Sequence, residues 1–226
     1  MSEGIEGLEH VRAVAWDFDG VLNRAGIKGS DGHYRWEAQV RAELGLDISG
    51  LSEQIFGTRL RALLTGQDDI LDRVEGWAQA AGHNDVAEDI LELIFEAEHD
   101  PDPALLRVIE QLHAAGITQV IATNNDPRRT RHIAQQSGMG DLVEAVFSSG
   151  EMGVMKPDAV YFDQIRAALG LEAPEILLID DLEVNIDGAD KQGWLGWQYS
   201  PGHPMPLVQA LMPLLLRAED GHDPRP

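Results

Sequence analysis

The sequence predicts an α/β fold, a Rossmann-like three-layer sandwich with a mostly parallel sheet, plus an inserted helical domain. Two observations support this prediction. From residue 102 onward, short apolar runs bounded by polar turns alternate with segments of helical periodicity, a pattern typical of βαβ units. Between the first apolar run and the second, however, the chain continues for about 100 residues, whereas a crossover connection needs only about a dozen.

The apolar runs are the expected strands. We place them at residues 11–17, 117–123, 142–148, 175–180 and, with a weaker pattern, 193–200. Several of the segments between them begin with Asp-Pro and end just before Gly, which are common start and stop signals of helices. These predicted helices are residues 102–116, 126–138, 156–170 and 181–193.

The long stretch after the first strand has the character of a separate helical domain. Helical patterns cover residues 36–45, 51–65, 68–81 and 85–98, and residues 27–33 form a turn or a small hairpin. We therefore predict an α/β core made of residues 1–23 and 102–226, and a helical domain made of residues 24–101.

Composition narrows the function. Acidic residues outnumber basic ones by 39 to 17, a formal net charge of -22, so the chain should repel nucleic acid. The densest basic stretch, residues 127–131, is expected to be a solvated face at the start of a helix. The absence of cysteine excludes disulfides and thiolate metal sites. The N-terminal residues lack the basic-then-apolar order of a signal peptide, and no apolar run is long enough to span a membrane. We therefore expect a cytoplasmic monomer or homodimer without a membrane partner.

Polar residues stand where the predicted strands end, which is where open parallel sheets bind ligands. The first strand is followed by Asp17, Asp19 and Gly20, and the second ends in Thr123 and Asn124. The fourth strand ends in Asp180 and Asp181, and the helix after the third begins with Lys156-Pro157. One edge of the sheet should therefore gather four carboxylates, a hydroxyl and an ammonium group.

Taken singly, most of these residues have ordinary explanations. Asp181 could cap a helix, Thr123 could be a normal strand residue, and Lys156 could be a solvated charge. Asp17 and Asp19 are harder to explain, because like charges side by side at the end of a buried strand are costly without a cation or donors.

The whole set suits phosphoryl transfer with a hard divalent cation. Mg²⁺ prefers oxygen ligands, which Asp17 and Asp181 could supply, and carboxylates form aspartyl-phosphates. Lys156 and the hydroxyl of Thr123 could hold the non-bridging phosphate oxygens. Asp19 would then protonate the leaving alcohol and later deprotonate water.

Four segments, "WDFDGVLN", "VIATNN", "GVMKPDAVYF" and "LLIDDLEVNIDGA", resemble in order and spacing the four motifs of the haloacid dehalogenase superfamily of hydrolases. The resemblance spans Val11 to about Ser200, and the helical insertion is similar to the α-helical caps of the superfamily's first cap class. The last segment most resembles that of sugar-phosphate phosphatases. Trp16 is a departure, because the residue before the first aspartate of this motif is usually small, aliphatic or phenylalanine. We expect this tryptophan to affect packing and not mechanism.

The resemblance implies a role for each matched residue. Asp17 would be the nucleophile and a metal ligand, Asp19 the acid/base whose backbone carbonyl also binds the metal, and Asp181 the direct Mg²⁺ ligand. The remaining assignments are phosphate binding by Thr123, Asn124 and Lys156 and support by Asp180, Asn185 and Gly20. Asp19 favours phosphate substrates, because the dehalogenases that name the superfamily lack it.

The predicted function is thus Mg²⁺-dependent hydrolysis of small phosphomonoesters, such as sugar phosphates, through an aspartyl-phosphate. A phosphosugar mutase of the same superfamily is the alternative, followed by a non-catalytic phospho-receiver or a pseudo-enzyme. Specificity should reside in the helical domain, where position alone suggests Arg35, Trp36, Arg59, Arg61 and Gln67. Trp77 and Phe95 match the apolar periodicity of that domain's own core.

Overall fold

A five-stranded parallel sheet lies at the centre of the molecule, which is described here from a computed structural model covering residues 5–216. The strands are β1 (Ala13–Trp16), β2 (Thr118–Thr123), β3 (Ala145–Ser148), β4 (Ile176–Asp180) and β5 (Leu195–Gln198), in the spatial order β3-β2-β1-β4-β5. Every neighbouring pair is parallel, which confirms the predicted fold class. Residues 1–4 and 217–226 of the predicted core lie outside the described part of the chain.

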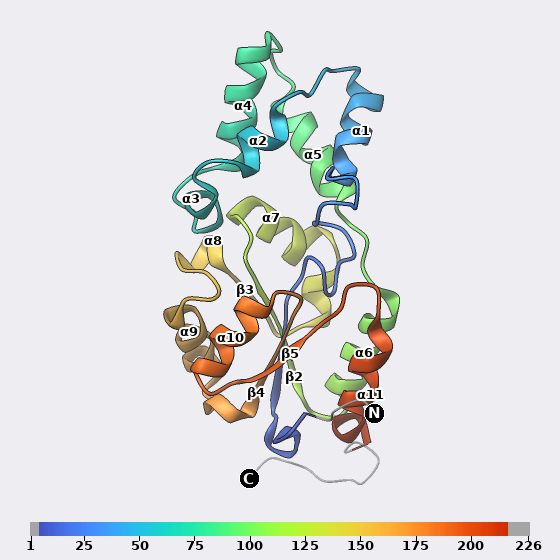
Figure 1. Cartoon of the computed structure of the whole chain (residues 1–226), viewed down its shortest axis with the longest axis vertical. Helices are drawn as coiled ribbons and strands as arrows, with labels where there is room; N and C mark the ends of the chain where they lie inside the picture. The colour runs from blue at the N-terminus through green and yellow to red at the C-terminus, as the bar shows by residue number, and fades with distance from the viewer. Residues whose placement is uncertain (1–4, 217–226) are drawn as a thin grey trace.

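Helices cover both faces of this sheet (Figure 1). α6 (Pro103–Ala114) and α11 (Pro204–Leu215) lie on one face, and α9 (Ala159–Leu169) and α10 (Glu183–Lys191) lie on the other. The short helices α7 (Pro127–Arg131) and α8 (Ser149–Met152) lie at the upper end of the sheet in Figure 1. Val14 and Trp16 of β1 join a hydrophobic cluster with α6 and α11, whereas Ala15, between them, faces a second cluster with α9 and α10. This alternation is the two-residue period of a strand. None of the helices in residues 5–216 is long and apolar enough to cross a membrane.

Trp16 fills the core as expected. Its side chain is fully buried, and its indole N–H donates to Gln119 Oε1 at 2.8 Å on the neighbouring strand β2. Its bulk therefore serves packing in the cluster that β1 shares with α6 and α11.

Five helices form a layer of their own at one end of the molecule (Figure 1). They are α1 (Arg35–Leu44), α2 (Leu51–Phe56), α3 (Leu60–Leu64), α4 (Ile70–Ala81) and α5 (Ala87–Ala97), and we call them, with their connections, the cap. The cap has a separate hydrophobic core. Trp77 is buried in that core as predicted, while Phe95 only packs against it and also faces the cavity described below.

The structure differs from the predicted helices in two places. Residues 51–65 are two helices, because Gly57 ends α2 and Arg59 takes a left-handed conformation with a φ of 59°. The helix predicted at 126–138 ends as α7 at Arg131 and continues as one π-helical segment, His132–Gln136. The third strand also begins later than predicted, because Met139–Leu142 form a 3₁₀ turn. Residues 27–33 contain turns and no strand.

Candidate functional site

The aspartates at the ends of β1 and β4 lie together, because these two strands are adjacent in the sheet. Asp17, Asp180 and Asp181 each offer a carboxylate oxygen, and these atoms all lie within 4.8 Å of one another. Three carboxylates at this spacing repel one another, so the arrangement requires positive charge nearby.

Lys156 supplies part of that charge from the segment between α8 and α9. Its Nζ lies 2.9 Å from Asp17 Oδ1 and 2.6 Å from Asp180 Oδ2, and it donates to the backbone carbonyl of Ala122 at 2.6 Å. The residue is only 1% exposed, so the solvated-charge explanation was wrong. Burial opposes its charge, but the carboxylates of Asp17 and Asp180 outweigh that cost and raise the pKa of Lys156.

The three carboxylates differ in their surroundings. Asp180 is fully buried, and its Oδ1 accepts hydrogen bonds from Asn185 Nδ2 and the backbone amide of Leu182, both at 2.9 Å. Burial raises the pKa of Asp17 to about 8, with Lys156 opposing and Asp180 adding to the rise. Burial and then the charge of Asp180 raise the pKa of Asp181 to about 6. Asp17 and Asp181 are therefore the two with oxygens left for a cation.

Gly20 is required by its closeness to Asp181. Its φ is 87°, and a Cβ placed on it would lie 2.7 Å from Asp181 Oδ2. Any larger residue would be strained in this conformation and would displace the carboxylate.

Asn124 positions Lys156 through its side chain. Its Oδ1 accepts from the backbone amide of Lys156 at 2.9 Å, and its Nδ2 donates to the backbone carbonyl of the same residue at 3.0 Å. Both polar groups of the side chain that we expected to bind phosphate are thus already bonded. Thr123, at the end of β2, is 1% exposed and lines the same cavity.

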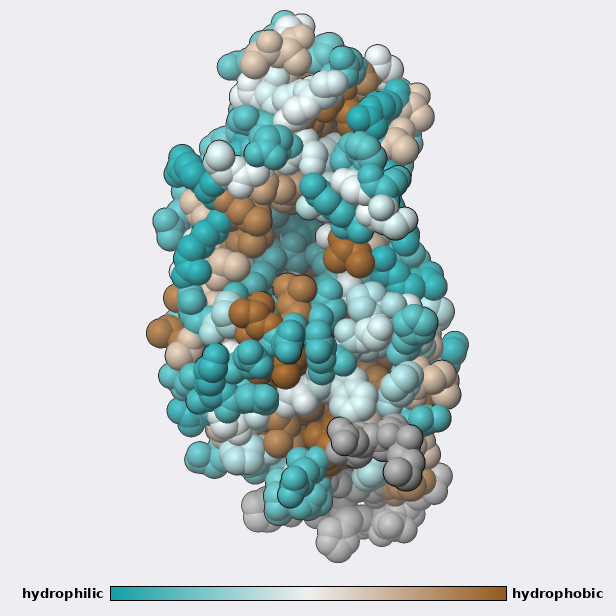
Figure 2. Space-filling view, in the orientation of Figure 1, coloured by the Kyte–Doolittle hydropathy of each residue, from teal (hydrophilic) through white to brown (hydrophobic). Residues whose placement is uncertain are grey.

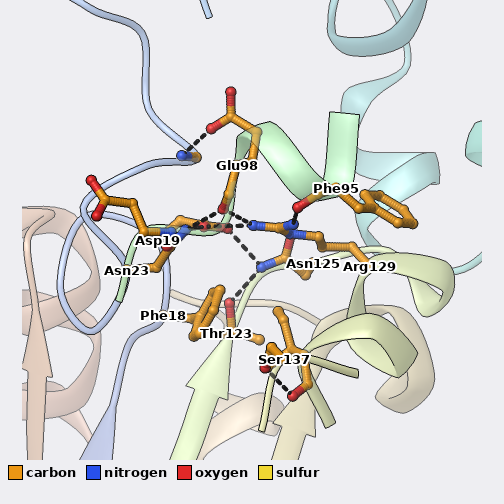
Figure 3. Close-up of polar contacts among 12 residues, drawn as sticks. Phe18, Asp19, Asn23, Phe95, Glu98, Thr123, Asn125, Arg129 and Ser137 are labelled. Carbon is orange, nitrogen blue, oxygen red and sulfur yellow. Dashed lines mark hydrogen bonds and ion pairs between the residues drawn. The ribbon is translucent and has the colours of Figure 1, made fainter. Parts of the chain in front are cut away.

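Asp19 lies outside the group of three carboxylates and is held by three other side chains (Figure 3). Asn23 Nδ2 donates to its Oδ1 at 2.7 Å, and Arg129 Nη2 lies 3.4 Å from the same oxygen. Asn125 Nδ2 donates both to Asp19 Oδ2 at 3.1 Å and to Thr123 Oγ1 at 2.8 Å. One amide thus joins the residues we expect to serve as acid/base and phosphate-binding hydroxyl.

Arg129 was missed by the sequence reasoning, which treated residues 127–131 as a solvated face. It is 5% exposed, and it donates to the backbone carbonyls of Phe95 at 3.2 Å and Glu98 at 2.6 Å at the end of the cap (Figure 3). Its guanidinium also lies 5.7 Å from the ring centroid of Phe18. The signal available was Asp126-Pro127, a helix start placed directly after β2, which puts the first turn of α7 at the edge of the sheet.

A cavity of about 360 Å³ opens above these residues, between the core and the cap, and Figure 2 shows the molecule hollowed there. Asp17, Asp19, Thr123, Lys156 and Asp181 line its floor. A larger and more open hollow of about 640 Å³, between α5 and α7, contains none of these five residues.

Of the five specificity candidates, only Trp36 lines the cavity. Arg35 pairs with Asp100 at 2.6 Å, and Arg61 pairs with Asp158. The side chain of Arg59 is 71% exposed, and Gln67 donates to Thr65 Oγ1 at 3.2 Å. Position within the helical domain therefore did not suffice to predict which polar side chains line the cavity.

The chain is similar to phosphatases in sequence and to haloacid dehalogenase family enzymes in fold. A phosphatase of Mycobacterium tuberculosis is 26% identical over 185 residues, which cover 79% of this chain and 82% of the relative. A ribulose-1,5-bisphosphate 5-phosphatase of Halopiger xanaduensis is 33% identical over 92 residues, but these cover only 40% of this chain and 38% of that enzyme. Among solved structures, a haloacid dehalogenase family enzyme of Bacteroides thetaiotaomicron in a magnesium complex has a TM-score of 0.72 at 16% identity, covering 88% of this chain and 98% of that chain.

The model of the haloacid dehalogenase-like hydrolases matches residues 11–193. That span runs from β1 through the cap to the end of α10, so it includes every strand-end residue described above. The chain therefore belongs to the haloacid dehalogenase-like hydrolases and is an enzyme of that family.

Proposed function

We propose that this enzyme is a Mg²⁺-dependent phosphatase that hydrolyses small phosphomonoesters through an aspartyl-phosphate on Asp17. The observation that carries the proposal is the position of Asp17, which lines the cavity with Lys156 Nζ 2.9 Å from its carboxylate. The names of the relatives from Mycobacterium tuberculosis and Halopiger xanaduensis support phosphatase activity. The Bacteroides thetaiotaomicron enzyme, which shares the fold, has also been crystallised with magnesium and inorganic phosphate.

The donor set fits magnesium. Three carboxylates offer oxygens within 4.8 Å of one another, and Lys156 pairs with only two of them. Every candidate ligand is an oxygen, as Mg²⁺ prefers. We propose that Asp17, Asp181 and the backbone carbonyl of Asp19 would hold the ion. When bound, Mg²⁺ would offset the charge of the carboxylates and of the phosphate.

The side chains then divide the reaction between them. Asp17 attacks phosphorus, the bond from phosphorus to the ester oxygen breaks, and that oxygen takes a proton from Asp19 and leaves as the alcohol. Asp19, now ionised, takes a proton from water, which attacks the aspartyl-phosphate, releases inorganic phosphate and restores Asp17. Lys156 and the Thr123 hydroxyl stabilise the non-bridging oxygens, where negative charge lies in the transition state.

Other residues serve by holding these groups in place. We propose that Asn124 positions Lys156 through the two backbone hydrogen bonds described above, and that Asn185 positions Asp180. We also propose the predicted division into a core of residues 1–23 and 102–226 and a cap of residues 24–101. In this division the cap closes over the phosphate and sets the choice of alcohol.

The proposal is tested with 4-nitrophenyl phosphate, whose leaving group needs little protonation. Hydrolysis should require Mg²⁺, stop on addition of EDTA, and release one inorganic phosphate for each nitrophenolate. Full activity in EDTA would contradict the metal assignment. Release of the alcohol from a natural-type ester without inorganic phosphate, with the phosphoryl group on a second hydroxyl, would instead identify a mutase.

A further inference from the structure

The cap side of the cavity is apolar. Its walls are formed by aromatic and aliphatic side chains of α1, α2, α3, α5 and the residue before α1, namely Tyr34, Trp36, Phe56, Leu60, Leu64 and Phe95. The rings of Tyr34 and Phe56 lie 5.0 Å apart, and those of Tyr34 and Trp36 lie stacked at 6.0 Å. These contacts make a continuous apolar surface that faces the floor of carboxylates.

Within residues 5–216, Glu98 is the one charged side chain that the cap contributes to this lining. Its carboxylate accepts hydrogen bonds from the backbone amides of Gly26 and Trp36, so it joins the two connections between cap and core. Burial raises the pKa of Glu98. A second phosphate group on a substrate would meet this acid and no cation from the cap.

The two cations of the lining belong to the core and are already engaged. Lys156 contacts Asp17 and Asp180, and Arg129 contacts Asp19 and two backbone carbonyls. Among the described side chains on the cap side, a bound sugar would find only the Glu98 carboxylate, the Tyr34 hydroxyl and the indole N–H of Trp36 as polar partners. Each further buried hydroxyl would lack a partner, which reduces affinity roughly 5- to 150-fold. The cap therefore disfavours polyols and bisphosphates.

The mouth of the cavity is also apolar. Ile27, on the connection into the cap, is 39% exposed, and Leu182, at the start of α10, is 52% exposed. Figure 2 shows hydrophobic side chains around the rim of the hollow. An apolar ligand that extends outward from the phosphate site would cover both side chains and remove their surface from water.

We infer that the substrate is a monophosphate ester of a hydrophobic alcohol, whose hydrocarbon part lies against the cap walls and leaves between Ile27 and Leu182. This inference rests on the phosphatase function proposed above and does not alter its chemical steps. It differs from the sugar-phosphate expectation, because it assigns specificity to apolar contact in place of hydrogen bonding.

The direct test measures kcat/KM for ethyl, butyl and hexyl phosphate, with glucose 6-phosphate as the polar comparison. If each methylene is buried, kcat/KM should rise roughly 4-fold per methylene, or on the order of 10²-fold from ethyl to hexyl phosphate. Hexyl phosphate should also exceed glucose 6-phosphate. A flat chain-length series, or glucose 6-phosphate as the better substrate, would overturn the inference. No hydrolysis of any ester, 4-nitrophenyl phosphate included, would instead contradict the phosphatase proposal itself.

Two exposed aliphatic side chains give a matched pair of variants. Leu182 lines the cavity, whereas Val184, two residues further along and 55% exposed, does not. Leu182→Gln should reduce kcat/KM for hexyl phosphate several-fold with little effect on ethyl phosphate, and Val184→Gln should change neither. Ile27→Gln, which unlike Leu182→Gln is not adjacent to a site aspartate in sequence, should reproduce the effect of Leu182→Gln. An unchanged chain-length series in both cavity variants would overturn the placement of the hydrocarbon part.

Discussion

The two sides of the cavity are built on different principles. On the core side, the charged side chains hold one another through short, directed contacts, such as Lys156 with Asp17 and Asp180. On the cap side, the lining is almost wholly aromatic and aliphatic, and its contacts carry no fixed bond direction. The sheet places the aspartates at the ends of β1 and β4 and Thr123 at the end of β2, whereas the cap has its own hydrophobic core.

This difference suits the core side to the reaction and the cap side to the choice of substrate. A buried charge is stable only with its partners in place, so a change on the core side disturbs several groups together. An apolar wall selects by shape and area, so a change on the cap side alters the preferred substrate and leaves the reacting groups intact. Variants of the core side should therefore have the largest effects on activity.

Asp17→Asn should abolish phosphatase activity. The amide is too weak a nucleophile to attack phosphorus, and loss of a nucleophile typically lowers kcat by more than about 10⁴-fold. The measurement is the rate with 4-nitrophenyl phosphate, with circular dichroism to confirm folding. Asp163→Asn, at an exposed acid on α9, is the matched control and should keep full activity. Near-parental activity in Asp17→Asn would remove this residue from the centre of the mechanism.

Asp181→Asn should raise the Mg²⁺ concentration needed for half-maximal activity by at least about 10- to 100-fold, because a neutral amide replaces a charged oxygen ligand. A titration of activity against Mg²⁺ measures this shift. Asp187→Asn, at an exposed position on the same helix that follows β4, should leave the titration unchanged. Equal curves for Asp181→Asn and the parent would show that the ion is held elsewhere.

Asn125→Ala should lower kcat by about 10-fold while KM changes little. The variant loses the amide that donates to Asp19 Oδ2 and Thr123 Oγ1, and a hydrogen bond to a charged group contributes about 1.5–3 kcal/mol. Steady-state kinetics with 4-nitrophenyl phosphate separates the two parameters. Asn84→Ala, at an exposed position between α4 and α5, is the control. A change confined to KM would mean that Asn125 serves ground-state binding only.

The smallest expected effect, on stability, comes from removing the contact between the cap and the core at Asp69. This residue caps α4 by accepting the amide of Leu71 at 2.9 Å, and it pairs with Arg128 of α7 at 2.6 Å. The hydrogen bond from Arg128 lowers the pKa of Asp69, so its stabilisation is present above the ordinary aspartate pKa and is lost as the pH falls through the lowered value. Because the pair is partly exposed, it should contribute at most about 1 kcal/mol.

Asp69→Asn keeps a good helix cap and removes only the ion pair. Its free energy of unfolding at pH 7 should be lower than that of the parent by at most about 1 kcal/mol, and the two should converge at acid pH. Urea unfolding at a series of pH values measures both quantities. A difference in unfolding free energy that is constant at all pH values would assign the effect to the N-terminal capping of helix α4 and not to the ion pair with Arg128.

The parallel sheet and the meeting of its strand ends were predictable because both follow from local patterns. Apolar runs define strands, and the carboxyl ends of adjacent parallel strands share an edge, which is why Asp17, Lys156 and Asp181 were correctly expected together. The break at Gly57 was less visible, since apolar periodicity continues through residues 51–65.

The contacts of Asn124, Asn125 and Arg129 could not be predicted, because they depend on tertiary packing. An arginine within a basic run looks solvated until α7 places it against the carbonyls of Phe95 and Glu98. In the same way, Arg35 and Arg61 look available for a substrate until the fold pairs them with Asp100 and Asp158. Sequence patterns show which residues reach the edge of the sheet, but not which neighbours use their hydrogen-bonding groups.

We expect Asp17 to carry the phosphoryl group and Asp19 to transfer the protons. Asp19→Asn keeps the nucleophile but removes the base that activates water, a loss worth roughly 10²- to 10⁴-fold. With 4-nitrophenyl phosphate, whose phenolate leaves readily, the first step should outpace the second. Mass spectrometry of the acid-quenched variant should therefore find one added phosphoryl group, located on Asp17. A phosphoryl group on another residue, or turnover by Asp19→Asn at the parental rate, would contradict the account.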